Sequence, residues 1–224
     1  MAQEWIDLSQ AIYEGMSYAK QFPPPCVTTL LEVEKDGLNA TQFTLVTHAG
    51  THVDAPLHFI KGGQTIDAYP VSAFYRRGVV IEASKGPLQP ITASDLEEAQ
   101  PRVRKGEILV LRTGYGARFG SEEYFDHPYL SEDAAQWIVN RGVAIVAIDA
   151  VTVDLPFPLR PPNFTFPVHH LLLGRGVLII ENLADPLRLV GQRVTIACFP
   201  LKIRDADGAQ ARVVAGIKTP KRRR

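Results

Sequence analysis

HAGTHVDAPLHF, residues 48–59, holds three of the six histidines of this 224-residue chain, together with one aspartate. His48 and His52 are four residues apart, as on one face of a helix, but a glycine and a proline interrupt a regular helix here. The segment instead predicts the end of a strand followed by a turn. Such a turn can gather these two imidazoles, Asp54 and His58 around one point.

The composition of this cluster indicates a metal site. Neutral imidazoles and a carboxylate suit Zn²⁺, Mn²⁺ or Fe²⁺, and no nearby cysteine supports a thiolate structural site. Crowded imidazoles repel one another when protonated. When neutral, they add little stability by lying close together, unless they bind a metal or transfer protons. Satisfied histidines in a polar loop are the alternative. Three histidines and an aspartate around one glycine turn favour the metal.

Ligands from one segment rarely complete a catalytic coordination sphere, so we expect others from elsewhere in the chain. The remaining histidines, His127, His169 and His170, are candidates, together with acidic residues at strand ends. FPVHHLLLGRGVLIIENL, residues 166–183, predicts a short helix carrying His169 and His170, and then a strand with Glu181 near its end. Antiparallel packing would bring these two ends together. A solvent-facing strand end is the alternative for Glu181.

The surrounding sequence predicts a mixed α/β domain. Thr92 with Asp95, Ser131 with Gly142, and Pro167 mark the limits of three helices. A hairpin is expected from residues 27–34 and 39–48 around a Lys35-Asp36-Gly37 turn. Runs rich in Val, Ile and Leu predict buried strands at residues 78–84, 107–113, 143–149, 177–183 and 194–199.

The domain is expected to span residues 1–217, without an interdomain linker or an internal repeat. Residues 218–224, KTPKRRR, form a basic tail. Such a tail could bind nucleic acid or act as a localisation signal, but a solvated, disordered terminus is the favoured interpretation.

Charge and cysteine content narrow the class of partner. Lys+Arg and Asp+Glu are both 24, so no net field attracts nucleic acid or an anionic membrane, and the expected partner is small or another protein. Cys26 and Cys198 lie far apart without a CxxC motif, which argues against a disulfide scaffold. Without a signal-like N-terminus or a long apolar run, we expect a cytoplasmic protein.

HAGTHVDAPLHF resembles the HxGTHxDxPxHF signature of the cyclase-like metal-dependent hydrolases, the family that contains bacterial kynurenine formamidases and isatin hydrolases. The resemblance extends over most of the chain, through DLS at 7–9, GEILVLRTGY at 106–115, GVAIVAIDAVTVD at 142–154 and HHLLLGRGVLIIE at 169–181. It implies a single mixed-sheet domain of the swivelling β/β/α type, assembled as a homodimer or homotetramer.

The resemblance also implies residue roles. His58 would be the catalytic proton shuttle, which accepts a proton from a metal-activated water and passes it to the departing nitrogen of an amide. The metal would be Zn²⁺, or Mn²⁺ as the alternative, with one ion of higher coordination or two ions per subunit. Its implied ligands are His48, His52, Asp54, His169 and Glu181. The spacing of twelve residues to Glu181 selects His169 over His170.

One region departs from the family pattern. Kynurenine formamidases usually carry a WPGD-like stretch after the first strand, where this chain reads GMSYAKQFPPPC at 15–26. Tyr18 and Phe22 are candidates for an aromatic pocket wall, with ordinary packing as the alternative. The expected reaction is hydrolysis of a non-peptide C–N bond in a small, aromatic amide, as in an arylformamidase.

Three other functions are alternatives. A cyclic amide or lactone could be opened by the same apparatus, as in isatin hydrolase. The same fold could serve as a non-catalytic metal-binding module, although the presence of His58 favours an enzyme. A dinucleotide loop at 112–120 has little support, because its glycines follow GxGxxxG and not GxGxxG.

Overall fold

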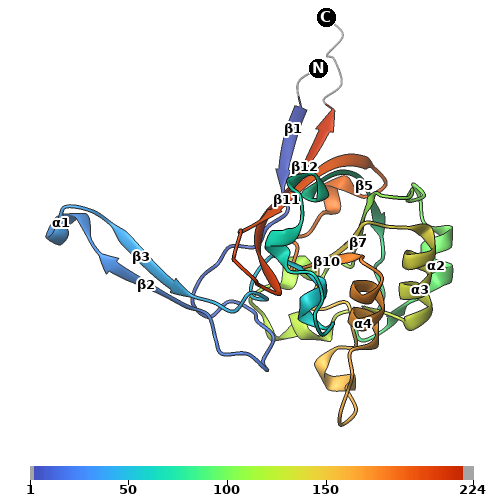
Figure 1. Cartoon of the computed structure of the whole chain (residues 1–224), viewed down its shortest axis with the longest axis horizontal. Helices are drawn as coiled ribbons and strands as arrows, with labels where there is room; N and C mark the ends of the chain where they lie inside the picture. The colour runs from blue at the N-terminus through green and yellow to red at the C-terminus, as the bar shows by residue number, and fades with distance from the viewer. Residues whose placement is uncertain (1–2, 219–224) are drawn as a thin grey trace, which may run out of the picture.

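Eight strands form one sheet in the computed structural model, which describes residues 3–218. In chain order they are β1 (Gln3–Asp7), β4 (His52–Asp54), β5 (Tyr75–Glu82), β7 (Ile108–Arg112), β9 (Ile145–Ile148), β10 (Leu178–Glu181), β11 (Arg193–Pro200) and β12 (Gly208–Lys218). Their order across the sheet is β1-β12-β11-β5-β7-β9-β10-β4, and β4 also pairs with β12. Seven strands therefore close into a barrel-like ring, and β1 extends it beside β12 (Figure 1).

The five predicted buried strands are confirmed as β5, β7, β9, β10 and β11. β5, β7, β9 and β10 run parallel as neighbours and are apolar on both faces. Val80 and Val110 point into the barrel core, whereas Val79 and Leu109 belong to a second apolar cluster that includes helix residues. Burial on both faces explains why these strands read as continuous apolar runs.

Three helices cover the outer face of the barrel: α2 (Ala93–Glu98), α3 (Glu132–Arg141) and α4 (Pro167–Gly174). All three were predicted. The Thr92 and Asp95 side chains form a capping box, and Gly142 ends α3 in the left-handed conformation. Ser131 begins α3 as predicted, but its hydroxyl donates to the Ile91 carbonyl instead of capping the helix.

The predicted hairpin is confirmed as β2 (Cys26–Leu31) and β3 (Ala40–Thr44), joined by the one-turn helix α1 (Val33–Asp36). Figure 1 shows it as an arm, here called the β2–β3 arm, that projects away from the barrel. Gly37 takes the left-handed conformation that ends α1. A third sheet consists of two short parallel strands, β6 (Pro90–Ile91) and β8 (Tyr129–Leu130).

The connections contain seven 3₁₀ helices: η1 (Pro56–His58), η2 (Ile66–Ala68), η3 (Val71–Phe74), η4 (Tyr115–Arg118), η5 (Glu122–Asp126), η6 (Phe157–Leu159) and η7 (Leu187–Leu189). Within residues 3–218, no helix combines the length and apolar character needed to cross a bilayer. Lys218 ends β12, so this strand reaches the first residue of the predicted basic tail. The rest of that tail, residues 219–224, lies outside the described residues.

Candidate metal centre

The predicted turn after the hairpin strand is present, but a short strand that was not predicted follows it and carries His52 and Asp54. The hairpin strand ends at Thr44, the turn comes next, and β4 follows it. Gly50 lies in this turn at φ 68°, a conformation that favours glycine. β4 could not be recognised as a strand because it has only three residues, and its partners β10 and β12 come from the other end of the chain. This pairing sets His52 directly opposite Glu181.

His52 and Asp54 present two buried acceptors to the same space. His52 Nδ1 donates to the Gly50 carbonyl at 2.8 Å, which leaves a lone pair on Nε2. His52 Nε2 lies 3.1 Å from Asp54 Oδ1 and 3.7 Å from Glu181 Oε2. Neither His52 Nε2 nor Asp54 Oδ2 has a hydrogen-bond partner among the described residues. Buried acceptors without donors are costly, and a divalent cation would satisfy both, so these residues fit a metal ion.

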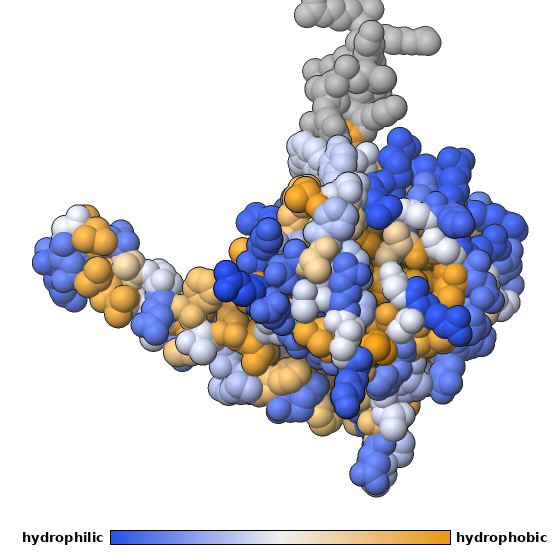
Figure 2. Space-filling view, viewed as in Figure 1, coloured by the Kyte–Doolittle hydropathy of each residue, from blue (hydrophilic) through white to orange (hydrophobic). Residues whose placement is uncertain are grey.

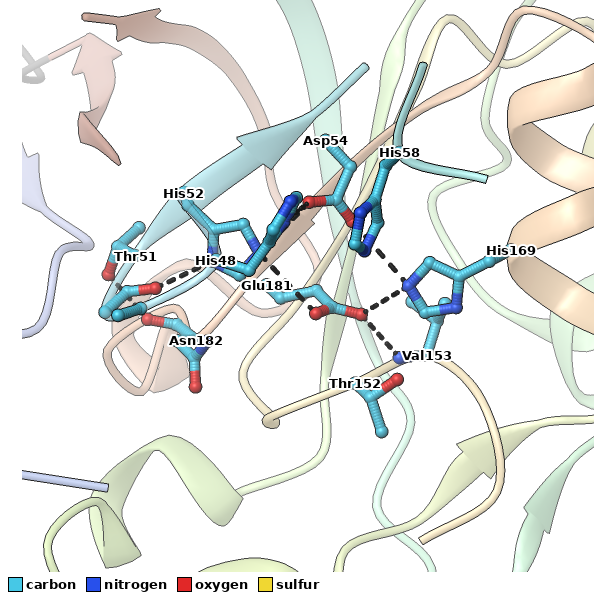
Figure 3. A network of polar contacts seen from close by, with 12 residues as sticks. His48, Thr51, His52, Asp54, His58, Thr152, Val153, His169, Glu181 and Asn182 are labelled. Carbon is cyan, nitrogen blue, oxygen red and sulfur yellow. Dashed lines mark hydrogen bonds and ion pairs between the residues drawn. The ribbon is translucent and has the colours of Figure 1, made fainter. Parts of the chain in front are cut away.

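His169 reaches the same point from α4 (Figure 3). Its Nε2 lies 3.2 Å from Glu181 Oε1 and 3.6 Å from Asp54 Oδ2, whereas its Nδ1 lies 2.6 Å from Asp154 Oδ2. Burial alone would lower the pKa of His169, but its contacts with the carboxylates of Asp154, Asp54 and Glu181 together outweigh this and raise the pKa well above the ordinary value. Glu181 is itself oriented by the Val153 N–H, which donates to Oε1 at 2.9 Å.

His48 lies between two carboxylates. Its Nδ1 is 2.8 Å from Asp54 Oδ1 and its Nε2 is 2.9 Å from Asp207 Oδ2. Burial opposes protonation, but these carboxylates raise the pKa of His48 to about 9. Burial would also raise the pKa of Asp54, yet the imidazoles of His52 and His48 hold it well below its ordinary value.

His58 stacks on His48 with 3.6 Å between ring centroids. Its Nδ1 lies 3.4 Å from Asp207 Oδ2. Burial lowers the pKa of His58, and the contact with Asp207 opposes this shift only in part. Neutral imidazole is therefore favoured near pH 7, which suits a proton acceptor.

Among the described residues, two sets of ligand atoms are close enough to hold an ion: His48, Asp54 and His58 in one, and His52, Asp54 and Glu181 in the other. Asp54 belongs to both. The structure thus brings together all five predicted ligands, with His169 against Glu181, and His58 itself belongs to one of the two sets.

The other candidate histidines lie apart from this cluster. His127 is fully buried, its Nδ1 donates to the Pro128 carbonyl at 2.8 Å, and burial lowers its pKa to about 4. His170 is exposed and contacts the Phe59 ring at 5.2 Å. The preference for His169 over His170 agrees with this geometry.

Sequence reasoning missed three residues that support the cluster. Asp154 orients His169, and Asp207 contacts both His48 and His58. Gly208 leaves room for them, because a Cβ there would lie 2.9 Å from His48 Cε1. Asp154 ends a quoted motif, GVAIVAIDAVTVD, which was a usable signal. Asp207 and Gly208 stand in an unremarkable polar loop and gave none.

A pocket opens onto the cluster, and it is lined by His48, His58, His169 and Glu181 together with several aromatic residues. Phe22 is one of them and stacks on His48 with 6.1 Å between ring centroids. Tyr18 is not part of this lining, and Lys20 Nζ packs over its ring instead. Of the two candidates for the aromatic wall, Phe22 therefore occupies that position.

The glycine-containing loop at 112–120 serves a different purpose. The backbone N–H groups of Thr113 and Gly114 donate to the Asp149 carboxylate at 2.6 and 2.9 Å. These amides are therefore not available to cradle a phosphate, in agreement with the low weight given to a dinucleotide loop.

Comparison with known proteins extends these observations. The family model described as "Putative cyclase" matches residues 6–155. Kynurenine formamidase from Bacillus cereus is 29% identical over 214 residues, which cover 94% of this chain and 96% of that protein. The matches confirm the predicted resemblance and support metal-dependent amide hydrolase activity.

Two solved structures share the fold. A structure described as a potential metal-dependent hydrolase with cyclase activity has a TM-score of 0.80 and 27% identity, and the match covers 98% of this chain and 100% of that one. Isatin hydrolase A from Ralstonia solanacearum has a TM-score of 0.86 and 23% identity, with 96% and 92% of the two chains covered. The predicted single mixed α/β domain is confirmed.

Proposed function

Because the chain belongs to the cyclase family, we propose that it hydrolyses the non-peptide C–N bond of a small aromatic amide with the help of a bound divalent cation. The observation that carries the proposal is the pair of buried acceptors, His52 Nε2 and Asp54 Oδ2, beneath an aromatic pocket. Kynurenine formamidase, to which the chain is similar over most of its length, is named as a formamidase of an aromatic compound, and arylformamides are the substrate class we propose.

We propose that His48, His52, Asp54, His169 and Glu181 hold one or two ions of Zn²⁺, with Mn²⁺ as the alternative. Borderline-soft imidazoles combined with carboxylates support this choice of metal. When bound, the ion would lower the pKa of a coordinated water to near 7 and so supply a nucleophile at neutral pH.

Residues of the protein transfer the proton and orient the groups around it. His58 Nδ1 faces Asp207, so Nε2 carries the lone pair that takes the proton and returns it to the departing nitrogen. Asp154 keeps His169 Nε2 directed toward Glu181. Phe22 and the other rings of the pocket exclude water from the aromatic part of the amide.

Parallel assays of metal-loaded protein test the proposal. N-formylkynurenine represents arylformamides, isatin represents cyclic amides, and a lactone completes the set. Turnover of the arylformamide alone supports the proposed reaction. Turnover of isatin or the lactone alone would establish the ring-opening alternative, and failure with every compound would favour a non-catalytic module.

We also propose that the chain assembles as a homodimer or homotetramer through the β2–β3 arm. An isolated two-stranded hairpin is only marginally stable in water, and this one exposes Leu30, Val33, Leu38 and Phe43. Figure 2 shows apolar residues gathered toward the end of the arm. A second copy of the chain would cover them.

Sedimentation velocity tests this assembly. Phe43→Glu should shift the chain toward monomer, whereas a charge at the exposed Val71 on the barrel should not. A monomeric native chain would contradict the proposal. For location we propose the cytoplasm, which the exposed free thiol of Cys26 supports.

A further inference from the structure

One arginine lies in the wall of the pocket, close to the proposed metal ligands. Arg160 Cζ is 4.7 Å from the ring centroids of both Phe157 and Phe166, and 5.5 Å from that of Phe164. Its Nε donates to the Leu155 carbonyl at 2.8 Å. These contacts hold the guanidinium against the rings and occupy its Nε.

The charge of Arg160 has no counter-ion of its own. Within residues 3–218 no carboxylate lies within 4.0 Å of it, and neither Nη1 nor Nη2 has a hydrogen-bond partner there. Arg112 shows the contrast, because Nε and Nη2 of its guanidinium both donate to the Asp185 carboxylate, at 2.9 and 3.1 Å. A half-buried cation without an anion is costly and lacks the pairing that such groups normally find.

The surroundings of Arg160 favour an anionic ligand, and not another group of the protein, as its partner. Burial lowers the pKa of its guanidinium, although the carboxylates of Asp154 and Glu181 act in the opposite direction. Asp154 already binds His169, and Glu181 is a proposed metal ligand. A cation held by Glu181 would add positive charge to the same pocket.

We propose that Arg160 binds a carboxylate of the substrate, so that the amide cleaved by this chain belongs to an anionic aromatic compound. The inference rests on the hydrolase function proposed above and deepens it. A guanidinium matches a carboxylate through two parallel hydrogen bonds, and the free Nη1 and Nη2 atoms are suited to this. The aromatic lining, which includes Phe22 and Phe59, would hold the ring between this carboxylate and the scissile amide.

A matched substrate pair tests the inference. The metal-loaded protein is assayed with ortho-formamidobenzoate and ortho-formamidobenzamide, which differ only in carrying a carboxylate or a neutral amide. The assay is repeated with a second pair, in which a longer chain joins the carboxylate or amide to the ring. Arg160→Met should lower kcat/KM for the carboxylates by about 10- to 100-fold, the range expected for a hydrogen bond to a charged group. It should leave kcat/KM for the neutral amides nearly unchanged.

Two further variants sharpen the comparison. Arg160→Lys keeps the charge but loses the planar fork, so its loss should be smaller, and it replaces the Met variant if that one fails to fold. Arg141→Met is the control, because Arg141 also stacks on a ring, that of Trp137, but pairs with Glu97 away from the pocket. Equal losses for charged and neutral substrates would overturn the inference.

A binding measurement separates this inference from the proposed function. Calorimetry with ortho-aminobenzoate and ortho-aminobenzamide needs no turnover. Tighter binding of the carboxylate to the native protein, reduced by Arg160→Met, supports the subsite even if no formamide is cleaved. Equal binding of the two compounds, or carboxylate binding that Arg160→Met leaves unchanged, would overturn it.

Discussion

His169 Nε2 lies 3.2 Å from Glu181 Oε1, although one side chain comes from helix α4 and the other from the end of strand β10. Asp54 Oδ2, from β4, lies 3.6 Å from the same His169 nitrogen. Three elements therefore direct their polar ends to one buried point. Such convergence of imidazole and carboxylate is the arrangement that a divalent cation requires.

Replacement of His58 separates proton transfer from metal binding. We expect His58→Ala to reduce turnover by about 10² to 10⁴-fold, the usual contribution of general acid/base catalysis, with nearly unchanged metal content. Elemental analysis of the dialysed variant measures the metal, and His170→Ala provides an exposed neighbouring control. Equal loss of metal and activity would make His58 a ligand.

The predicted ligands should behave differently. In His52→Ala or Asp54→Asn, bound metal and activity should fall together, because each change removes one of the two buried acceptors. The metal content after dialysis is measured against native protein treated in the same way. Full retention of metal in both variants would contradict their assigned roles.

Asp154 supports the site through His169. Asp154→Asn leaves a neutral partner for His169 Nδ1, which weakens control of the tautomer. We expect metal affinity to fall by about 10- to 100-fold, measured by competition with a chelator. Asp205→Asn, on the surface, is the control. An affinity equal to that of the native protein would show that Asp154 only holds the backbone of α4, to which it is also hydrogen-bonded.

The capping box of α2 makes a stability prediction. Thr92→Ala should lower the free energy of unfolding by about 1 kcal/mol, measured by urea denaturation.

Burial would raise the pKa of Asp95, but hydrogen bonds from Lys85 and Thr92 lower it below 3.8. The stability that Asp95 contributes is therefore fully present above pH 3.8 and is lost as pH falls through its lowered pKa. The difference in the free energy of unfolding between native protein and Asp95→Asn should therefore shrink as the pH falls. A difference that stays constant with pH would contradict this account.

The buried strands and the three helices could be predicted because each carries its signal locally. The apolar run at 143–149 and the Thr92 capping box need no information from the rest of the chain. β12 was missed because GAQARVVAGIK alternates small, polar and apolar residues and resembles an exposed segment. β4 has only three residues, and strands that are distant in sequence define it.

The candidate site divides in the same way. His48, His52, Asp54 and His58 form a local motif. His169 and Glu181 were candidates from the predicted helix and strand, and the resemblance selected His169 over His170. Asp207 and Arg160 became visible only in the folded chain, because barrel closure brings the first to the histidines and packing against three phenylalanines fixes the second. Isolated charged residues carry no sequence signal of this kind.

Metal titration of the dialysed protein, followed by assay of an arylformamide at each step, tests the central claim most directly. We predict that activity starts near the uncatalysed rate and rises in proportion to bound Zn²⁺ or Mn²⁺, until one or two ions are held per chain. Asp54→Asn should show neither the binding nor the rise. Undiminished amide hydrolysis by the metal-free protein, or equal metal binding by Asp54→Asn, would contradict the account.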